Sequence, residues 1–475
     1  MRALTLHETA AAMGGRVFGP IEIPSVMSVC IDSRSPISGA LFFAIRGERF
    51  DGHDYVEHAL ENWAAAAVVN DIHRVHKRFH TCGRLIEVDD CTRALGKLAA
   101  WYRRQFAAQV IAVLGSNGKT TTKDLIATVL KSKKRGQAAQ ASFNNAIGVP
   151  LTLLAVEPSD AFVVVEIGGN QIGEIGALSR IAQPDMVVVT SIAEEHLAGF
   201  GDLAGVAREE FSFLSSMRGP PFIVMNQQVI QFAPKPLRIQ DHAGSPVSSR
   251  QDMTRLTYGF DACADLRAED VEQTSTGQRF RVNGRFDYHL PLMGRHNLLN
   301  ALAAIAIGTR FRLSHTDIAK ALGGAKSPPM RMQVMKQGSI TLINDAYNAN
   351  PGSMKAAFQA LDDTRPLGRR VLILGDMKEL GQQVTRCHQQ VGRDAGASTA
   401  QVIVAVGTHA RVVADGAIAT AGTTKRIYSY PTIEALTGRL PRLLEAGDQV
   451  LLKASRGFRL EQIIPTIEQC GRRDD

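Results

Sequence analysis

Unbroken runs of apolar residues, rich in valine and isoleucine, recur from about residue 110 onward. The clearest are VIAVL at 110–114, FVVVE at 162–166, MVVVT at 186–190 and FIVMN at 222–226. Longer segments of mixed polarity separate them. Because the strands of a parallel sheet are buried on both faces and are joined by helices, this pattern predicts an α/β domain with a parallel central sheet.

The residues before and after these runs have a different pattern of apolar and polar positions. Residues 1–82 contain shorter β-like runs separated by polar turns, which predict a small α/β domain. Residues 227–290 hold alternating segments and predict a β-rich insertion. The apolar segment at 296–308 predicts a helix that packs on the central sheet.

A polar, proline-containing segment at 323–333 precedes a third series of apolar runs, VLILGD at 371–376, VIVAVG at 402–407 and QVLLKAS at 449–455. This series predicts a Rossmann-like unit with its own core. We therefore expect an α/β protein of three domains. Their expected limits are 1–82, 83–325 and 326–475.

The composition is that of a folded globular protein. The 475 residues suffice for several domains, since a domain usually contains about 100–200 residues. Hydrophobic residues make up 45% and charged residues 21%, which excludes a disordered or coiled-coil chain. The sequence lacks a signal-peptide pattern and a long apolar run, and its 6 cysteines are scattered without metal-ligand spacing. We expect a soluble protein of the reducing cytoplasm.

The charge balance favours polyanionic partners. Lys and Arg total 54 against 46 Asp and Glu, a formal charge of +8. Nucleic acids, anionic lipids and nucleotides all satisfy this balance. The basic run KSKKR at 131–135 ends a predicted helix, where cations offset the helix dipole, so we interpret it as a helix end and not as a nucleic-acid patch.

The strongest chemical signal is VIAVLGSNGKTTTKDLIATVL, in which an apolar strand leads into a glycine loop and then a helix. Backbone amides of such a loop point at phosphate oxygens, Lys119 can reach the β and γ phosphates, and the Thr120 hydroxyl suits Mg²⁺. The first glycine of the Walker A pattern is missing, because Val113 stands there. The residues expected to bind ATP are Gly115, Ser116, Asn117, Gly118, Lys119, Thr120 and Thr121.

Two polar residues follow neighbouring predicted strands. Glu166 ends the run FVVVE, and His196 lies shortly after the run MVVVT. The carboxyl ends of parallel strands open into the ligand crevice of such sheets. Glu166 is therefore the expected acidic partner of the nucleotide-bound metal. His196 belongs either to the same site or to the structural framework.

Together the motifs resemble those of the Mur ligases, ATP-dependent enzymes that build the peptidoglycan stem peptide. The matching strings, in the family's order, are GSNGKTTT, FNNAIGVPLTLL, HLAGFGDLAGVA, RHNLLN and INDAYNANPGSM. The strings IDSRSPISGALFFAIRGERFDGHDY and LGDMKELG are similar to those of the members that add D-alanyl-D-alanine. The resemblance covers nearly the whole chain.

The resemblance implies an N-terminal domain that holds the uridine diphosphate, a central ATPase domain and a C-terminal domain that carries the incoming dipeptide. The implied cofactors are ATP and Mg²⁺. The implied reaction converts a carboxylate of UDP-N-acetylmuramoyl-tripeptide into an acyl phosphate, which the amine of D-alanyl-D-alanine attacks. This is the last cytoplasmic step of peptidoglycan precursor synthesis. A monomer without nucleic-acid or integral-membrane partners is expected.

The family's site residues can be carried over by motif. Lys119, Glu166 and His196 would be catalytic, with Thr120, Glu166 and His196 as ligands or near-ligands of the metal. The residues implied near ATP are Asn297, Asn300, Arg331, Asp345, Tyr347, Asn348 and Asn350. The residues implied near the UDP-sugar, the peptide or the amine are Asp32, Ser33, Arg34, Asn144, Asn145, Lys453, Ser455 and Arg456.

The chain departs from the family pattern at two places. Most Mur ligases carry a lysine, modified to a carbamate that helps to place a second Mg²⁺, about a dozen residues after the HL motif. Residues 205–219 contain no lysine, and Arg208 stands near the expected position. The candidate replacements Glu195, Glu209 and Glu210 are either carboxylate ligands or solvent-facing charges. The second departure is Met330, where the family has glycine.

Three alternatives to the implied activity remain open from the sequence. A paralogue could join a different acid and amine, and a catalytically weak relative could only bind the ligands. A nucleic-acid-stimulated ATPase would instead need aromatic or arginine-rich strips, for which 2 Trp, 7 Tyr and scattered basic residues give little support.

Overall fold

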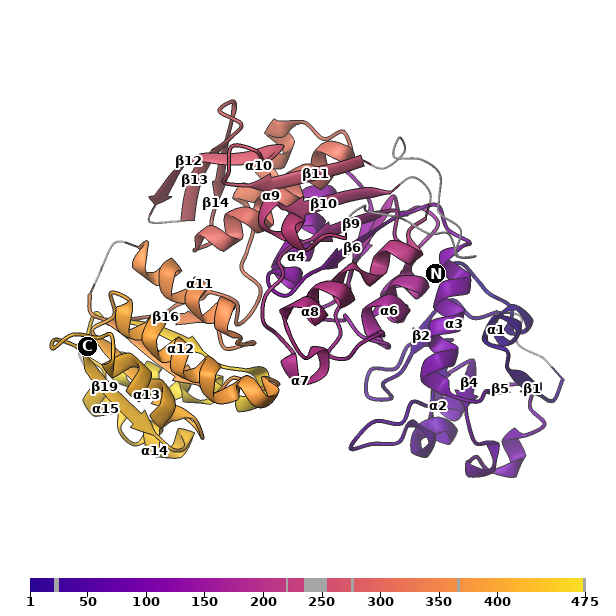
Figure 1. The fold of residues 1–475 in the computed structure, drawn as a ribbon. Coiled ribbons are helices and arrows are strands. Elements are labelled where there is room, and N and C mark those ends of the chain that lie inside the picture. Colours follow the sequence, from indigo (N-terminus) through magenta and orange to yellow (C-terminus); the bar gives the residue numbers. More distant parts are fainter. Residues whose placement is uncertain (21–24, 219–220, 235–253, 275–276, 365–367, 473–475) are drawn as a thin grey trace.

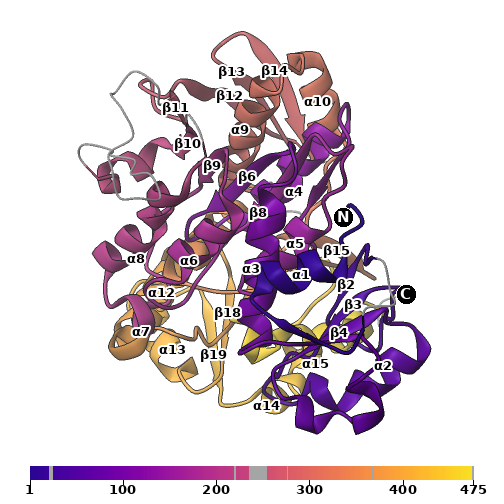
Figure 2. The ribbon, with the colours of Figure 1, turned by 90° about the vertical axis from the view of Figure 1, so that its right-hand side faces the viewer.

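The computed structural model describes residues 1–20, 25–218, 221–234, 254–274, 277–364 and 368–472. Three β-sheets follow one another along the chain, each with its own helices (Figure 1). The central sheet lies between the other two (Figures 1 and 2). The predicted α/β class with three sheet-based units is confirmed.

The N-terminal unit is built on a five-stranded sheet of order β1-β5-β4-β3-β2. Strands β2 to β5 are parallel, and β1 pairs antiparallel with β5. Its elements are α1 Leu6–Met13, β1 Arg16–Phe18, β2 Val29–Cys30, β3 Leu41–Phe43, α2 Val56–Asn62, β4 Ala66–Val69 and β5 Leu85–Glu87, followed by α3 Cys91–Arg103.

The central sheet has nine strands in the order β14-β13-β12-β11-β10-β9-β6-β8-β7. Its strands are β6 Gln109–Leu114, β7 Gly136–Ala138, β8 Phe162–Glu166, β9 Met186–Val189, β10 Phe222–Asn226, β11 Thr254–Gly259, β12 Leu266–Thr274, β13 Gly277–Val282 and β14 Phe286–Leu290. Its helices are α4 Lys119–Lys131, α5 Gly148–Leu154, α6 Glu174–Ala182, α7 Leu197–Phe200, α8 Leu203–Glu210, α9 Arg295–Arg310 and α10 His315–Gly323.

The predicted β-rich insertion belongs to this central sheet. Strand β11 pairs in parallel with β10, and β12 to β14 extend the sheet as an antiparallel edge. Residues 235–253 of the predicted insertion lie outside the described part of the chain. Helix α9, predicted at 296–308, packs on β10 to β12 and against α4.

The C-terminal unit has a six-stranded sheet of order β15-β16-β20-β17-β18-β19, parallel except for β15. Its strands are β15 Gln333–Gln337, β16 Ile340–Asn344, β17 Arg370–Gly375, β18 Val402–Val406, β19 Arg426–Tyr430 and β20 Gln449–Lys453. Its helices are α11 Pro351–Asp362, α12 Val384–Ala397, α13 Ala410–Ile418, α14 Ile433–Thr437, α15 Leu440–Leu443 and α16 Ile464–Gly471.

Strand β6 shows why the central runs are apolar except at their ends. Val110, Ala112 and Leu114 belong to a core that also includes the buried side chains of the N-terminal sheet and of α3. Ile111 and Val113 point to the opposite face and join the core beneath α4 and α9. Each face removes apolar surface from water, at about 25 cal/mol per Å², so both need hydrophobic side chains.

The strand register brings the functional loops to one edge. Strand β6 lies between β8 and β9, and Val113 pairs with both Glu166 and Val188. The loop after β6, the end of β8 and the segment after β9 therefore meet at the carboxyl edge of the sheet. Within the described residues, we found no helix with both the length and the apolar character needed to cross a membrane.

Candidate active site

The glycine loop between β6 and α4 is fixed against the segment that follows β9. The Ser116 amide donates to the Ser191 carbonyl (2.8 Å), and the Asn117 amide donates to Ser191 Oγ (2.9 Å). A Cβ on Gly115 would lie 2.4 Å from Thr190 Oγ1, and Gly115 and Gly118 have φ angles of 112° and 84°. Only glycine fits both this space and these backbone angles.

Lys119 lies at the start of α4 among buried carboxylates. Its Nζ donates to the Gly115 carbonyl (2.5 Å) and lies 4.0 Å from Glu195 Oε1. Burial alone would lower the pKa of Lys119, but Glu195, Glu210 and Glu166 together raise it. The ammonium is therefore held charged, as a site for phosphate oxygens requires.

Glu195 and Glu210 are the buried partners of this lysine, with 5% and 1% of their surface exposed. Burial raises the pKa of each carboxyl, while the Lys119 charge opposes the rise. Glu210 Oε2 also accepts the Gly115 amide (2.8 Å), so it fixes the start of the glycine loop from behind. The Lys119 ammonium, at the end of the glycine loop, is therefore surrounded by acidic side chains.

Glu166 has the geometry expected of a metal ligand. The residue is 1% exposed, its Oε1 accepts a hydrogen bond from Asn144 Nδ2 (3.1 Å), and its Oε2 is buried without a hydrogen-bond partner. A buried carboxylate oxygen without a partner is costly unless a ligand completes it. The Thr120 hydroxyl, 3.4 Å from Ser142 Oγ, supplies a second hard oxygen at this edge.

This donor set fits Mg²⁺. Mg²⁺ is commonly held by one or two protein oxygens, with phosphates and water completing its octahedron. No group of three or more His, Cys, Asp and Glu side chains within the described residues could form a metal site from protein ligands alone. Glu166 and Thr120 would hold the ion together with the nucleotide phosphates. His196 offers a nitrogen, which Mg²⁺ prefers less than oxygen.

Helix α9 reaches the opposite side of the glycine loop. A Cβ on Gly118 would lie 2.5 Å from Asn300 Oδ1, and Thr122 Oγ1 donates to the same atom (3.1 Å). Asn300 Nδ2 donates to Asn297 Oδ1 (2.9 Å), and both amides are buried. The predicted pair thus lies beside the loop, and its contact with adenine stays a prediction.

The C-terminal unit contacts this site through several predicted residues. Asn350 Nδ2 donates to Asn117 Oδ1 of the glycine loop (2.9 Å). The Arg331 guanidinium lies over the Tyr347 ring, 4.1 Å from its centroid, and donates to Ser142 Oγ (3.5 Å). Residues more than 200 positions from the glycine loop are therefore in contact with it.

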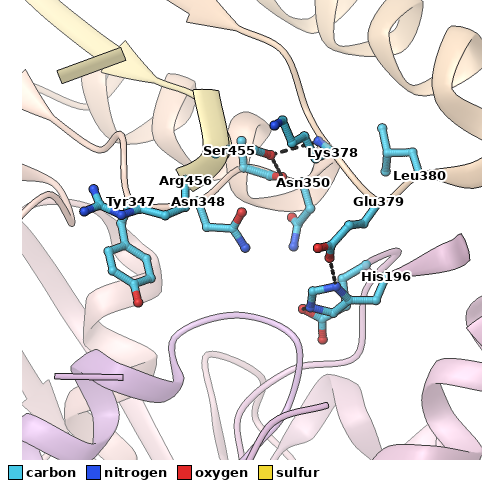
Figure 3. Close-up of a pocket in the computed structure, with 12 residues that line it drawn as sticks. His196, Tyr347, Asn348, Asn350, Lys378, Glu379, Leu380, Ser455 and Arg456 are labelled. Atoms are coloured by element: carbon cyan, nitrogen blue, oxygen red, sulfur yellow. Dashed lines mark hydrogen bonds and ion pairs between the residues drawn. The ribbon is translucent and has the colours of Figure 1, made fainter. Parts of the chain in front are cut away.

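A cavity of about 290 Å³ lies between the central and C-terminal units. Figure 3 shows His196 and Glu379 on one side of it and Tyr347 and Arg456 on another. The full lining is Glu195, His196, Tyr347, Asn348, Ala349, Asn350, Lys378, Glu379, Leu380, Ser455, Arg456 and Gly457. The cavity combines cations, carboxylates and amides, which suits a small zwitterionic ligand.

Some predicted residues lie elsewhere or are already paired. Arg34 forms a two-pronged ion pair with Asp32, at 2.9 and 2.7 Å, in the N-terminal unit. Asn145 Oδ1 accepts two backbone amides at the start of α5. Lys453 is buried against Asp345 (2.5 Å) and the Asn348 carbonyl (3.0 Å), so it orders the loop after β16.

Lys378 and Glu379 are not among the site residues predicted from the sequence, although they belong to the string LGDMKELG. Both come from the loop after β17 and line the cavity, and Figure 3 shows Glu379 pointing toward His196. Glu379 contacts the His196 ring, and its backbone φ of 65° is unusual for a residue other than glycine. The available signal was their place after an apolar run, at the carboxyl edge of a predicted strand.

Three protein-family models match consecutive parts of the chain, which together cover most of it. Residues 25–103 match "Mur ligase family, catalytic domain", residues 113–308 match "Mur ligase middle domain", and residues 330–456 match "Mur ligase, glutamate ligase domain". A UDP-N-acetylmuramoyl-tripeptide--D-alanyl-D-alanine ligase of Bacillus subtilis is 34% identical over 97% of both chains.

The chain belongs to the Mur ligase family. The Escherichia coli enzyme of the same name is also 34% identical, over 99% of this chain and 100% of its own. Among solved structures, MurF from Acinetobacter baumannii superposes with a TM-score of 0.84 at 28% identity, covering 99% of each chain. MurF from Thermotoga maritima has the same fold, with a TM-score of 0.79 at 23% identity, covering 95% of this chain and 99% of its own.

The structure shows that one of the two interpretations of Glu209 and Glu210 in this Mur ligase is wrong. Glu209 and Glu210 are not solvent-facing charges, because both are buried on α8. Both oxygens of Glu209 accept backbone amides at the start of α6, from Gly173 and Ile175 (2.8 Å each). Arg208 points outward and is exposed. Glu209 therefore stabilises a helix end, which leaves Glu210 and Glu195 as the carboxylates beside Lys119.

The activity of this Mur ligase is expected to be independent of carbon dioxide. The carboxyl groups of Glu195 and Glu210 belong to the side chains themselves, whereas a lysine carbamate needs bicarbonate or CO₂ to form. Phosphate release in CO₂-depleted buffer should equal that in bicarbonate-supplemented buffer within assay error. Activity that falls on depletion and returns with bicarbonate would contradict this expectation.

The second departure, Met330, has a structural explanation. Its φ is 60°, in the left-handed region that glycine enters freely. A methionine adopts it at a cost of roughly 1–2 kcal/mol. The Met330 side chain makes a contact that glycine could not make, since Arg456 Nη1 donates to its sulfur (3.1 Å).

Proposed function

We propose that this Mur ligase uses ATP to join D-alanyl-D-alanine to UDP-N-acetylmuramoyl-tripeptide, forming the pentapeptide precursor of peptidoglycan. The observation that carries the proposal is the convergence of the glycine loop, Lys119 and Glu166 on one edge of the central sheet, beside a cavity for a small zwitterion. The names of full-length relatives at 34% identity supply the substrates.

The chemistry needs activation because a carboxylate is a poor electrophile at neutral pH. The tripeptide carboxylate attacks the γ phosphorus of ATP, the bond to the bridging oxygen breaks, and an acyl phosphate and ADP form. The dipeptide amine, having lost a proton, then attacks the acyl carbon and expels phosphate. Each step moves negative charge onto oxygens that fixed donors can stabilise.

The chain's own groups are arranged for these steps. Lys119 and the amides of the glycine loop contact the phosphate oxygens, and the N-terminus of α4 adds its dipole. Bound Mg²⁺ supplies further charge neutralisation on the phosphates. Asn350 and Arg331 approach the loop from the C-terminal unit and help to exclude water from the reactive acyl phosphate. The amine would occupy the cavity near His196.

The other predicted residues keep their proposed roles. Asp32, Ser33 and Arg34 would contact the UDP-sugar, Asn144 and Asn145 the substrate beside the ATP site, and Asn297 and Asn300 the adenine. We also infer a cytoplasmic monomer, because the reaction consumes ATP and all site residues come from one chain. The domain limits at about residues 82 and 326 belong to the same proposal.

Phosphate release measured with each substrate omitted in turn tests the function. The full mixture of ATP, Mg²⁺, UDP-N-acetylmuramoyl-tripeptide and D-alanyl-D-alanine should release phosphate, and mass spectrometry should detect the pentapeptide product. Omission of either the peptide or the dipeptide should reduce release to background. Release with nucleic acid, or activity only with a different acid and amine, would overturn the proposal.

Lys378 is expected to bind the carboxylate end of the dipeptide. It is exposed in the cavity and forms no ion pair among the interactions found within the described residues. A charge-assisted hydrogen bond contributes about 1.5–3 kcal/mol, so Lys378→Met should raise KM for D-alanyl-D-alanine by about tenfold or more. KM for ATP should stay unchanged.

An analogue separates this role from a general disturbance of the cavity. The C-terminal amide of D-alanyl-D-alanine lacks the carboxylate. The wild type should bind this amide more weakly than the dipeptide itself, whereas Lys378→Met should bind the two with equal affinity. Lys355→Met, an exposed lysine change on α11, is the matched control. If the variant discriminates between acid and amide as well as the wild type does, Lys378 does not bind the carboxylate.

A further inference from the structure

We propose that Glu379 is a positioning residue that holds the His196 ring across the interface between the central and C-terminal units. The Nδ1 atom of His196 is hydrogen-bonded to Glu379 Oε2 (Figure 3). The two residues are 183 positions apart and belong to different sheets' loops. The effect on catalysis rests on the proposed function, whereas the ring orientation itself does not.

The backbone on both sides is shaped for this contact. His196 and Glu379 have φ angles of 46° and 65°, and neither is glycine. Such conformations cost of order 1–3 kcal/mol and persist only when surrounding contacts fix them. Here the Ala198 amide donates to the Glu379 carbonyl (3.2 Å), which joins the two loops directly. The strained residues are the two that meet.

The contact determines which ring nitrogen faces the cavity. A carboxylate only accepts hydrogen bonds, so Nδ1 of His196 must carry the proton that is shared with Glu379. In the neutral ring, Nε2 is then the nitrogen with a free lone pair. Nε2 lies 3.8 Å from Glu195 Oε2, and the Phe200 ring packs edge-on against the imidazole, with centroids 6.1 Å apart. Tautomer and ring orientation are both fixed.

The tautomer places an acceptor where the proposed reaction needs a polar atom. His196 and Glu195 line the same cavity as Asn350 and Ser455, beside the glycine loop. Because Glu379 belongs to the C-terminal unit, this orientation exists only while that unit is docked. The Glu379 contact would therefore make assembly of the site depend on docking, as conformational steps do in many enzymes.

A second ion pair in the same interface provides a matched control. Arg386 Nη2 donates to Glu194 Oε1 (2.8 Å), two residues before His196. Among the described residues, Arg386 forms no hydrogen bond or ion pair with the imidazole. Arg386→Ala removes one link between the units and leaves the Glu379 carboxylate in place. If Glu379 only tethers the two units, Arg386→Ala and Glu379→Ala should change the His196 tautomer and kcat to a similar extent. If Glu379 positions the ring, only Glu379→Ala should change them strongly.

NMR of the full chain labelled with ¹⁵N-histidine tests the tautomer directly, without substrates. The His196 signals are assigned by their absence in His196→Gln. The wild type and Arg386→Ala should show the Nδ1-protonated tautomer, and Glu379→Ala should lose it. Glu379→Gln keeps an acceptor oxygen and should retain it. An unchanged tautomer in Glu379→Ala, with an unchanged melting temperature as evidence of folding, would overturn the proposal.

Kinetics provide the second measurement. Loss of an orienting partner typically costs about 10–100-fold, so kcat should fall by that factor in Glu379→Ala, with KM for ATP unchanged. Glu379→Gln should lose less, and Arg386→Ala should stay within about twofold. Equal losses in Glu379→Ala and Arg386→Ala would refute positioning in favour of tethering. An inactive wild type would refute the proposed function and leave the NMR result to decide the ring orientation.

Discussion

Replacement of Lys119 by methionine is expected to reduce kcat by about 10³-fold or more. Loss of a single fixed donor to developing charge typically costs about 10²–10³, and Lys119 contributes a full charge as well. Its Nζ already lies within the glycine loop, on the Gly115 carbonyl, and the change leaves every backbone amide of the loop in place. The measurement is phosphate release under saturating substrates.

The same substitution should make stability more dependent on pH. Without the lysine, the pKa values of Glu195 and Glu210, already raised by burial, should rise further. The folded state then binds more protons than the unfolded state, so the free energy of unfolding falls as the pH rises above about 4.5, the ordinary pKa of a glutamate. Because the wild-type pKa values are already raised to about 8 for Glu195 and about 7 for Glu210, the thermal-melt profiles of the variant and the wild type should diverge above about pH 7. There the variant should lose stability more steeply than the wild type, because its carboxyls keep their protons in the folded state.

Lys131→Met is the control for both measurements, since Lys131 ends the same helix and is exposed. Its kcat and melting profile should match those of the wild type. A Lys119→Met variant that keeps more than a tenth of wild-type kcat would show that the lysine does not stabilise the transferred phosphoryl group. A melting profile parallel to that of the wild type would show that Lys119 does not compensate the carboxylates.

Replacement of Glu166 by glutamine is expected to reduce kcat by about 10²-fold and to raise the Mg²⁺ concentration needed for activity. Glutamine has nearly the same shape, and its amide oxygen can still accept the hydrogen bond from Asn144. What disappears is the charge and the buried oxygen without a partner, Oε2. Because Mg²⁺ prefers carboxylate oxygens, affinity for the ion should fall while the fold is preserved.

A readout without turnover separates metal binding from other roles of Glu166. The affinity for ADP, measured by calorimetry, should increase with Mg²⁺ in the wild type and much less in Glu166→Gln. Glu157→Gln, a change at a half-exposed residue that pairs with Arg135, should behave like the wild type. Identical Mg²⁺ dependence of ADP binding in wild type and Glu166→Gln would rule out Glu166 as a ligand.

Local sequence was sufficient for the main architecture. Strands β8 and β10 coincide with the predicted apolar runs at 162–166 and 222–226, and a helix follows the glycine loop as predicted. These features depend on hydrophobic periodicity and on glycine placement, which act over a few neighbouring residues. The end of β8 at Glu166 could be predicted for the same reason.

Local sequence was insufficient for the burial of charged residues. Glu209 and Glu210 follow Arg208 on α8, and nothing in the spacing of REE distinguishes exposed from buried positions. Their surroundings come from the Gly115 amide and from the start of α6, which are distant in the chain. A buried carboxylate is tolerated only where such donors meet it. Whether Glu209 and Glu210 meet these amides therefore depends on how α8 packs against α6 and the glycine loop.

The sequence by itself determined the α/β class, the three series of strands, the glycine loop that leads into the helix of Lys119, and the place of Glu166 at the end of a strand. Tertiary structure alone decided that Asn350 meets Asn117, that Glu210 supports the loop, and that Glu379 holds the His196 ring. The physical reason is range. Propensity and periodicity are properties of neighbouring residues, whereas a hydrogen bond between units depends on the packing of whole sheets and helices, which brings residues 183 positions apart within contact.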